Sequence, residues 1–334
     1  MKKAINWGLV GTGGITNKFL VGLKATEGGN AAAIVSRSQD SADAFAAKNG
    51  IPKAYADYEA MLSDPAIDVV YIGIPHPWHK EYALRAFRAG KAVLCEKPVC
   101  INAGELAELI QAAREKRVFF MEAMWTRFVP PLCKVREWIA AGRIGEVKMM
   151  EANFGFRAAW KPEGRLLNSE LGGGSLLDAG VYPVSLASMV FGGKQPEKVA
   201  GFLHIGETGV DEEFTGFISY GGSRVATVSA ANQTAMTNDA WIYGDKGRIY
   251  IPNFVFARSA ELISDGPDEK TIIPYEPVFT SNGYNFEAEE VMNCLREGKT
   301  ESEIMPLDES LQIMHTMDEI RAQWNFRYPT ENYT

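Results

Sequence analysis

The sequence predicts an α/β domain with a doubly wound parallel sheet, followed by an α+β domain with an open sheet. In the first third of the chain, short continuous apolar runs alternate with amphipathic stretches, which is typical of buried parallel strands joined by helices. After about residue 122, closely spaced strand candidates are separated by glycine-rich turns. The length of 334 residues accommodates two domains, which we place at residues 1–122 and 123–334.

The first domain is predicted from five apolar runs and two helices. The runs are residues 4–10, 31–36, 68–74, 92–95 and 118–121. They are continuous rather than alternating, so we expect strands that are buried on both faces. One predicted helix covers residues 77–89, with Pro77 in its first turn and Gly90 after its end, and another covers residues 102–116 and is capped by Asn102.

The second domain is predicted to contain helices at both ends of a run of strands. A helix over residues 130–141, a strand over 147–156 and a buried helix over 175–191 come first. The hairpin strands are residues 198–205, 214–220, 224–230, 240–243 and 248–251. Helices over residues 286–296 and 307–324 complete the chain, and we expect the last one to pack back on the first domain.

Composition and charge argue against several classes of partner. There are 34 basic and 42 acidic residues, a net charge of −8, which repels nucleic acid and anionic lipid. No apolar stretch reaches the ~20 residues of a membrane span, and residues 4–10 are interpreted as a strand rather than a signal peptide. The four cysteines form no C-x-x-C pair. We therefore expect a cytoplasmic protein with reduced thiols and no structural zinc.

A glycine-rich turn follows the first predicted strand. It has the sequence Gly11-Thr12-Gly13-Gly14-Ile15-Thr16. Gly11 permits a tight turn, and Gly13 allows the backbone to approach a pyrophosphate at the N-terminus of the next helix. We therefore expect Gly11, Gly13, Gly14 and Ile15 to bind a dinucleotide. Thr16 stands where the fingerprint has Gly or Ala, so an ordinary turn is the alternative.

The end of the second predicted strand bears on the choice of nucleotide. An NAD enzyme places an acidic residue there to hold the ribose 2′-hydroxyl. This chain has Ser36-Arg37-Ser38, and a guanidinium flanked by two hydroxyls suits a 2′-phosphate. We therefore predict NADP rather than NAD. The alternative is a solvated arginine at the start of the next helix.

A lysine follows another buried strand, in the run Glu96-Lys97-Pro98. In open parallel sheets, ligands bind at the carboxyl ends of the strands. A desolvated lysine beside a cationic nicotinamide has a lowered pKa and can exchange a proton. Lys97 is therefore a candidate catalytic residue, and a lysine that extends to the surface is the alternative.

Three motifs in this order resemble the Gfo/Idh/MocA family, which includes glucose–fructose oxidoreductase and inositol dehydrogenase. They are the glycine turn, the run at 96–98 and the run Gly172-Gly173-Gly174-Ser175-Leu176-Leu177-Asp178-Ala179-Gly180-Val181-Tyr182. Runs at residues 92–98, 121–128, 188–193 and 207–211 resemble the family's branch of dimeric dihydrodiol dehydrogenases and NADP-dependent D-xylose dehydrogenases. The resemblance implies a Rossmann domain, a second domain with a large, mostly antiparallel sheet, and a homodimer formed through that sheet's open face.

The resemblance also implies roles for residues of the motifs. Lys97 would be catalytic or position the nicotinamide beside Glu96, with a bond to Pro98 that is often cis. Tyr182, in place of the His of many members, would be the general acid/base. Asp178 lies four residues before Tyr182 and so on the same helical face, where it would orient the substrate hydroxyl or Lys97. A helix-start carboxylate and a hydrogen-bonded core phenol are the alternatives.

Two further groups are candidates for cofactor and substrate contacts. The resemblance places His76 and His79 along the nicotinamide half of the cofactor, and no third residue at a recognisable spacing suggests a metal site. His79 as a residue that only caps a helix is the alternative. Trp125 and Phe154 are candidate walls of the substrate pocket, near Phe156 and Trp160, although most such aromatics are core residues.

These observations predict NADP-dependent hydride transfer between the nicotinamide and a secondary alcohol of a D-xylose-like sugar or a trans-dihydrodiol. A ketose or anhydrosugar reductase of the same family is one alternative. A non-catalytic protein that senses NADP is another, and it needs neither Lys97 nor Tyr182, so the presence of both favours an enzyme.

Overall fold

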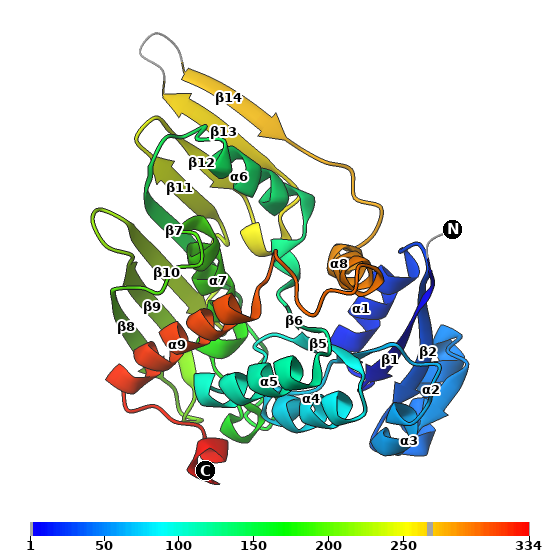
Figure 1. Cartoon of the computed structure of the whole chain (residues 1–334). Coiled ribbons are helices and arrows are strands. Elements are labelled where there is room, and N and C mark those ends of the chain that lie inside the picture. The colour runs from blue at the N-terminus through cyan, green and yellow to red at the C-terminus, as the bar shows by residue number, and fades with distance from the viewer. Residues whose placement is uncertain (1–2, 266–269, 334) are drawn as a thin grey trace. The chain divides into compact units, whose positions relative to one another are not determined.

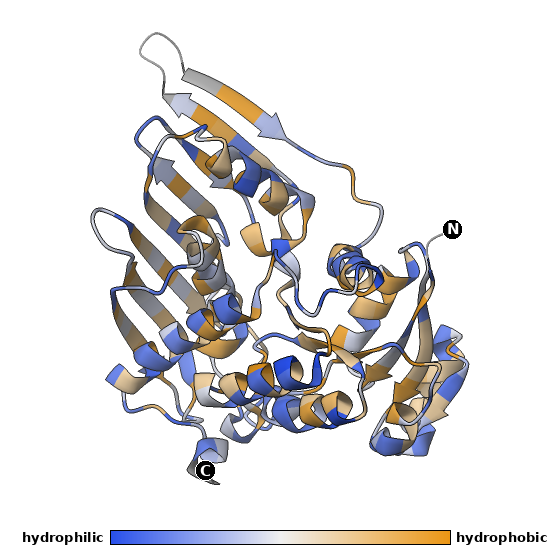
Figure 2. Ribbon diagram, viewed as in Figure 1, coloured by the Kyte–Doolittle hydropathy of each residue, from blue (hydrophilic) through white to orange (hydrophobic). Residues whose placement is uncertain are grey.

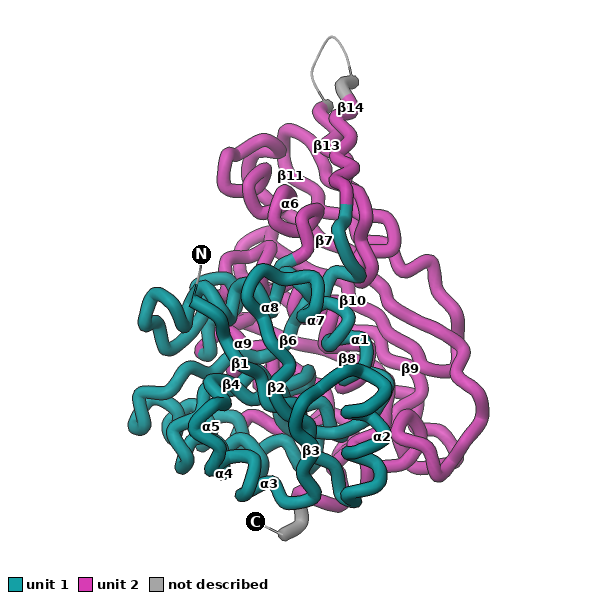
Figure 3. The backbone as a smooth tube through the Cα atoms, turned by 90° about the vertical axis from the view of Figure 1, so that its right-hand side faces the viewer, with its two compact units in different colours: residues 1–100, 104–128, 279–307 teal, residues 101–103, 129–278, 308–334 magenta. Residues whose placement is uncertain are grey.

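The computed structural model describes residues 3–265 and 270–333 and divides into two compact units (Figure 3). Unit 1 comprises residues 1–100, 104–128 and 279–307, and unit 2 comprises residues 101–103, 129–278 and 308–334. The boundary expected near residue 122 assigns residues 279–307 to the second domain, whereas their contacts place them in unit 1. In the part of the chain that the structure describes, no helix is long and apolar enough to cross a bilayer.

Unit 1 is built on a parallel sheet with the strand order β3-β2-β1-β4-β5-β6, which confirms the predicted doubly wound domain. Figure 1 labels β1, β2, β5 and β6 of this sheet. Its strands are β1 (Ile5–Val10), β2 (Gly29–Val35), β3 (Lys53–Tyr55), β4 (Val69–Ile72), β5 (Ala92–Glu96) and β6 (Phe120–Ala123). Every residue of β4, β5 and β6 is buried, as continuous apolar runs predict, and apolar residues follow the strands in Figure 2. The short strand β3 was not predicted because its residues are at most half-buried.

Helices cover both faces of this sheet. They are α1 (Gly14–Lys24), α2 (Gln39–Asn49), α3 (Tyr58–Leu62), α4 (His79–Arg88), α5 (Ala103–Lys116) and α8 (Tyr284–Arg296). The chain leaves β1 and β4 in opposite directions along the sheet, so right-handed crossovers place α1 and α4 on opposite faces. The late helix α8 packs on α1, and Gly22 permits this because a Cβ there would lie 2.6 Å from the Asn285 backbone nitrogen.

Unit 2 is built on a large sheet with the order β14-β13-β12-β11-β7-β10-β9-β8. Its strands are β7 (Val147–Gly155), β8 (Lys198–Ile205), β9 (Asp211–Ser219), β10 (Val225–Ala231), β11 (Ala240–Gly244), β12 (Gly247–Ile251), β13 (Ala260–Asp265) and β14 (Lys270–Tyr275). In the described residues only β7 and β10 pair in parallel, so the expected mostly antiparallel sheet is confirmed. β13 and β14 were not predicted.

One face of the second sheet is covered by helices, and along β7 and β9 the residues that alternate with the buried ones are exposed or half-buried. The helices of unit 2 are α6 (Pro130–Ala140), α7 (Val181–Val190) and α9 (Leu307–Gln323). Helix α7 packs on β7 and β10 and is buried almost all round, which explains its continuously apolar sequence. The single helix expected over residues 175–191 is instead a π-helical turn, Leu176–Gly180, followed by α7. That stretch carries two predicted site residues.

The edge strand β8 is closed by side chains from the end of α9. Gln323 accepts a hydrogen bond from the Gly201 N–H and donates one to the Val199 carbonyl. The indole N–H of Trp324 donates to the Gly201 carbonyl at 2.7 Å. Backbone groups that would otherwise offer an edge for strand pairing are thereby occupied.

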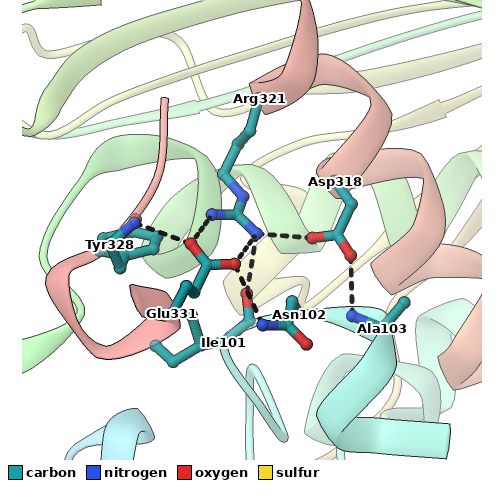
Figure 4. Close-up of polar contacts among 7 residues, drawn as sticks. All are labelled: Ile101, Asn102, Ala103, Asp318, Arg321, Tyr328 and Glu331. Atoms are coloured by element: carbon teal, nitrogen blue, oxygen red, sulfur yellow. Dashed lines mark hydrogen bonds and ion pairs between the residues drawn. The ribbon is translucent and has the colours of Figure 1, made fainter. Parts of the chain in front are cut away.

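A buried arginine joins the C-terminal segment to residues 101–103 within unit 2 (Figure 4). The Arg321 side chain is 4% exposed and donates to both carboxylate oxygens of Glu331, at 2.7 and 3.1 Å, and to Asp318 at 2.7 Å. Asn102 donates to Glu331, and the Ala103 N–H donates to Asp318. Asn102 therefore bonds a distant carboxylate, while Asp318 caps the first helical residue of α5.

Candidate active site

The glycine turn lies at the carboxyl edge of the parallel sheet, where the strand order reverses between β1 and β4. Gly11 has φ of +90°, and a Cβ on it would lie 2.8 Å from the Ile74 side chain, so it packs against the loop after β4. Cβ atoms built on Gly13 and Gly14 meet nothing within 4 Å. No side chain caps α1, and no acidic residue lies in its first turn. This helix N-terminus is therefore suited to an anionic group.

The structure accounts for the unusual third position of the fingerprint. Thr16 is fully buried, and its hydroxyl lies 3.4 Å from the Gly73 carbonyl oxygen. A Cβ on Gly73 would lie 2.6 Å from that hydroxyl oxygen. The absent side chain at Gly73 thus leaves the space that the larger residue at position 16 occupies.

At the end of β2, Arg37 and Ser38 are exposed. The Ser38 hydroxyl accepts a hydrogen bond from the Ser41 N–H at 3.3 Å and so caps α2. One of the two serines therefore has a local structural role. Arg37 itself follows the end of β2, which ends at Val35.

Glu96 is the last residue of β5, the neighbour of β4, and Lys97 follows it at the same edge. The Glu96 side chain accepts hydrogen bonds from the Tyr71 hydroxyl at 2.7 Å and from the Lys97 N–H at 3.2 Å. The Lys97–Pro98 bond is cis, as the family resemblance implied. The Lys97 side chain is partly exposed, and its backbone N–H is held by the buried carboxylate of Glu96.

His79 links this turn to the loop after β4. Its ring is fully buried, with Nδ1 3.1 Å from the Pro98 carbonyl oxygen and Nε2 2.7 Å from that of Ile74. The centroid of the His76 ring lies 6.0 Å away. The described residues contain no group of three His, Cys, Asp or Glu side chains placed to hold a metal. His79 therefore ties together two of the segments expected around the nicotinamide.

Trp125 follows β6 and is packed against another ring. It is 3% exposed and stacks on Tyr284 of α8, with centroids 4.7 Å apart and an angle of 13° between the planes. Glu287, also from α8, is fully buried, and its carboxyl oxygens have no hydrogen-bond partner among the described residues. Burial first, and the charge of Glu96 second, raise the pKa of Glu287 well above its usual value.

In unit 2, the π-helical turn carries Asp178, and the first turn of α7 carries Tyr182. Asp178 is 7% exposed and accepts a hydrogen bond from Arg165 at 2.6 Å. Tyr182 and Phe154 of β7 meet edge to face, with centroids 5.5 Å apart. The structure therefore brings the predicted Tyr182 and Phe154 together, but the two helical site residues do not share one regular α-helix as expected.

Profiles of known domains match both parts of the chain. Residues 5–124 match the oxidoreductase family with an NAD-binding Rossmann fold, and residues 132–250 match the GFO/IDH/MocA C-terminal domain. The chain belongs to the Gfo/Idh/MocA oxidoreductase family. Among its curated relatives are trans-1,2-dihydrobenzene-1,2-diol dehydrogenases of Xenopus laevis, 41% identical over 98% of this chain and 100% of that protein, and of Homo sapiens, 35% identical over 98% and 99%.

Solved members of the Gfo/Idh/MocA family share the whole architecture. A 3-ketoreductase from Actinomadura kijaniata, solved with NADP and TDP-benzene, is 25% identical and superposes with a TM-score of 0.85 over 96% of this chain and 98% of its own. An aldose–aldose oxidoreductase from Caulobacter crescentus has a TM-score of 0.87 at 21% identity, over 97% of this chain and 99% of its own. The second likeness concerns the fold alone.

Several partners of the predicted site residues were not found from the sequence. Arg165 pairs with Asp178, Tyr71 holds Glu96, and Tyr284 stacks on Trp125. Each partner is separated from its predicted residue by between 13 and 159 positions, and no motif marks it. Asp211 is different, because it ends the 207–211 run that supported the resemblance, although no role was assigned to it.

Proposed function

We propose that the protein is an NADP-dependent dehydrogenase that acts on a secondary alcohol of a trans-dihydrodiol or a D-xylose-like sugar. The observation that carries this proposal is full-length similarity to trans-1,2-dihydrobenzene-1,2-diol dehydrogenases at 35–41% identity. It is supported by the open helix N-terminus at Gly13 and by Lys97 at the carboxyl edge of the same sheet. Turnover of NADP with trans-1,2-dihydrobenzene-1,2-diol and with D-xylose is the direct test, and turnover of neither would contradict it.

The cofactor is proposed to bind to unit 1. The pyrophosphate would lie at the open N-terminus of α1, and Gly11, Gly13, Gly14 and Ile15 would provide close backbone approach. His76, His79, Glu96 and Lys97 would line the nicotinamide half. When bound, the oxidised nicotinamide supplies an acceptor for the hydride. Ser36, Arg37 and Ser38 would hold the 2′-phosphate, and the exposed guanidinium supplies the positive charge that this group needs.

The preference for NADP is tested by Arg37→Asp. Because an acidic side chain repels a 2′-phosphate and accepts a bond from a 2′-hydroxyl, we expect kcat/KM with NADP to fall by about 10- to 100-fold, with a gain for NAD. Arg88→Asp, at another exposed arginine of unit 1, is the control for the change of charge. Equal use of both cofactors by the parent and no change in the variant would contradict the assignment.

Proton transfer is assigned to Tyr182. As the hydride leaves the alcohol carbon, the hydroxyl proton passes to the phenol oxygen of Tyr182, which must first be ionised. Lys97 would polarise the reacting oxygen and favour that ionised form. Asp178, held by Arg165, would orient the substrate hydroxyl, with Trp125 and Phe154 as aromatic walls of the pocket.

These roles predict large losses of turnover in two variants. Tyr182→Phe and Lys97→Met should each lower kcat by about 10²- to 10⁴-fold, which is the usual contribution of a general acid or base. Tyr220→Phe is a matched control, because Tyr220 is also buried in unit 2 and stacks on Phe191 at 4.7 Å. Wild-type turnover in either active-site variant would refute its assigned role.

We also propose that the protein forms a homodimer through the open face of the large sheet. Phe202 of β8, Phe217 of β9 and Met149 of β7 are 58%, 56% and 47% exposed in the large sheet of unit 2. Trp241 stacks on Tyr250 across β11 and β12 at 4.4 Å. An apolar and aromatic face of this kind is typical of protein–protein interfaces. Sedimentation should show twice the mass of 36.7 kDa, and Phe217→Asp should shift the protein toward the monomer.

A further inference from the structure

The buried carboxylate of Asp211 accepts hydrogen bonds at the start of the segment that carries Asp178 and Tyr182. Asp211 begins β9 and is fully buried. Its Oδ2 accepts a hydrogen bond from the Ser175 hydroxyl at 2.8 Å and another from the Leu176 N–H at 2.6 Å. Those two donors immediately precede and begin the π-helical turn, Leu176–Gly180, which contains Asp178. The distance along the chain is 36 residues for Ser175, so this is a tertiary contact rather than a local cap.

The second oxygen of the same carboxylate faces the glycine run. Asp211 Oδ1 has no hydrogen-bond partner in the described part of the chain, and neither has the hydroxyl of Tyr328, which is also fully buried. Gly174 has φ of +130°, and a Cβ there would overlap Oδ1 and lie 3.1 Å from the Tyr328 hydroxyl. The run Gly172-Gly173-Gly174 therefore brings the backbone directly against the carboxylate, which a side chain at position 174 would prevent.

We propose that Asp211 is a positioning residue, whose ionised carboxylate holds Ser175 and Leu176 and thereby fixes the turn that carries Asp178 and leads into Tyr182. This inference rests on the proposed function, in which those two residues act on the substrate hydroxyl. Asp211 would touch neither substrate nor cofactor. Its effect on turnover would come through the placement of the turn, and a misplacement of about 1 Å is sufficient to cost about 100-fold in rate.

The surroundings of the Asp211 carboxylate make its hydrogen bonds with Ser175 and Leu176 sensitive to pH. Burial raises the pKa of Asp211 to about 6, opposed by the hydrogen bonds from Leu176 and Ser175 and by the positive charge of Arg321 on α9. The phenol of Tyr328 faces it from the C-terminal segment, and Asp178 in turn acts on that phenol. Protonation below about pH 6 replaces two charge-assisted hydrogen bonds with neutral ones that are roughly half as strong. The turn is therefore held less tightly in acid.

The kinetic test uses the full-length protein with NADP and trans-1,2-dihydrobenzene-1,2-diol between pH 5 and 8. Asp211→Asn keeps the shape but not the charge, and we expect kcat to fall by about 10- to 100-fold at pH 7.5 with the KM for NADP unchanged. We expect the kcat of the parent to fall below about pH 6 and the kcat of Asp211→Asn to lack this dependence. Ser175→Ala removes one of the two bonds, so it should lower kcat by a smaller factor, about 3- to 10-fold.

A matched control is available in the same unit. Ser188 on α7 donates to the Glu309 carboxylate at 2.7 Å and is 4% exposed, so Ser188→Ala removes the same kind of bond from an equally buried serine. It should leave both kcat and the pH profile unchanged. If Asp211→Asn does not fold, the pair Ser175→Ala and Ser188→Ala still decides the question.

Hydrogen exchange separates this inference from the proposed function, because it needs no substrate. Peptides covering residues 174–183 should exchange faster in Asp211→Asn and Ser175→Ala than in the parent at the same pH, and Ser188→Ala should not change them. Unchanged exchange would overturn the positioning role whatever the activity. Faster exchange with an unchanged kcat and pH profile would overturn the link to catalysis. If Tyr182→Phe retains wild-type turnover, the role assigned to Tyr182 fails, and if the parent turns over neither substrate, the proposed function fails. In both cases the exchange data still decide whether Asp211 holds the turn.

Discussion

Two carboxylates of unit 2, Glu331 and Asp211, are withdrawn from water, and they differ in whether a cation contacts them. Burial alone raises the pKa of both. In Glu331, hydrogen bonds from Arg321 at 2.7 and 3.1 Å, with others from Tyr328 and Asn102, more than offset burial, so its pKa lies below the usual value. Asp211 receives only neutral donors, and its pKa is raised to about 6. Within one unit, the carboxylate that an arginine contacts stays ionised and is suited to stabilising the fold. The carboxylate that no cation contacts directly is suited to changing its protonation state with pH.

Asp318 is intermediate between these two carboxylates in its contact with a cation. It shows how much contact with a guanidinium is needed to lower the pKa of a buried carboxyl group. It receives one guanidinium N–H at 2.7 Å and the Ala103 N–H at 2.8 Å. Its pKa is still raised, because burial outweighs the charge of Arg321 and these bonds. At Glu331, hydrogen bonds from the guanidinium to both carboxylate oxygens accompany a lowered pKa. At Asp318, a single hydrogen bond from the guanidinium leaves the pKa raised.

The largest effect is expected from removing the shared cation. Arg321→Leu leaves Glu331 and Asp318 with their charges largely uncompensated, so we expect a loss of about 3–5 kcal/mol in the free energy of unfolding, measured by urea denaturation at pH 7.5. Arg114→Leu is the control, because Arg114 is 44% exposed in its pair with Glu301 and should cost about 1 kcal/mol or less. Similar losses in the two variants would show that the buried arginine is no more important than a surface one.

The second prediction concerns how stability changes with pH. The folded pKa of Asp211, about 6, lies above the unfolded value of about 3.9, so ionisation of this group opposes folding above pH 6, and lowering the pH toward 4 adds up to about 3 kcal/mol. For Glu331 the folded pKa is the lower one, so its contribution is lost as the pH falls below about 4.3.

Between pH 7 and 5, Asp211→Asn should therefore change the pH dependence of unfolding, whereas Glu331→Gln should not. The asparagine variant should lack the gain in stability that the parent shows between pH 7 and 5, and the glutamine variant should retain it. Unfolding free energies measured at pH 7.5, 6 and 5 test this. The same slope in all three proteins would remove the proposed difference between the two carboxylates. Activity should fall in acid while stability rises, a combination that a purely structural aspartate does not produce.

The third prediction tests the close approach to Asp211. Gly174→Ala introduces a Cβ that overlaps Oδ1 of the carboxylate, at a φ of +130°. We expect a loss of about 2–4 kcal/mol, from overpacking added to backbone strain. Gly192→Ala, at φ of +78° with nothing within 4 Å, is a control for backbone strain alone and should cost about 1 kcal/mol. Equal losses would mean that Asp211 tolerates the extra methyl group.

The sequence was sufficient for most elements because their periodicities are local. The strand at residues 198–205 was predicted with the observed bounds, and the helix expected at 130–141 forms as α6, Pro130–Ala140. The π-helical turn was not predicted, since its shape depends on contacts with Asp211, more than 30 residues away. Assignment of residues 279–307 to unit 1 depends on packing of α8 against α1, which leaves no mark in either helix alone except Gly22.

The residues of the candidate site likewise fall into those that local motifs identify and those that only the packing of distant segments reveals. Gly11, Lys97, Asp178 and Tyr182 stand in recognisable motifs, so they were found. Glu287 was not, because a glutamate in an amphipathic helix resembles a solvated one until its burial is known. Arg165 lies in a loop whose sequence gives no sign that it will bond Asp178. Residue types reveal chemistry, whereas the partners that set their ionisation appear only when distant segments pack together.

The smallest effect is expected at a pair that resembles Arg321–Glu331 only in its geometry. Lys134 and Glu137 on α6 lie 2.7 Å apart, the same distance as the buried contact, but their side chains are 34% and 64% exposed. Glu137→Gln should therefore cost about 0.5 kcal/mol or less, and 1 M salt should abolish the difference from the parent. The cost of Arg321→Leu should persist in 1 M salt, since buried charges are screened far less. If both costs vanished together, solvent would reach the arginine, and its charge would no longer explain why Glu331 and Asp211 differ.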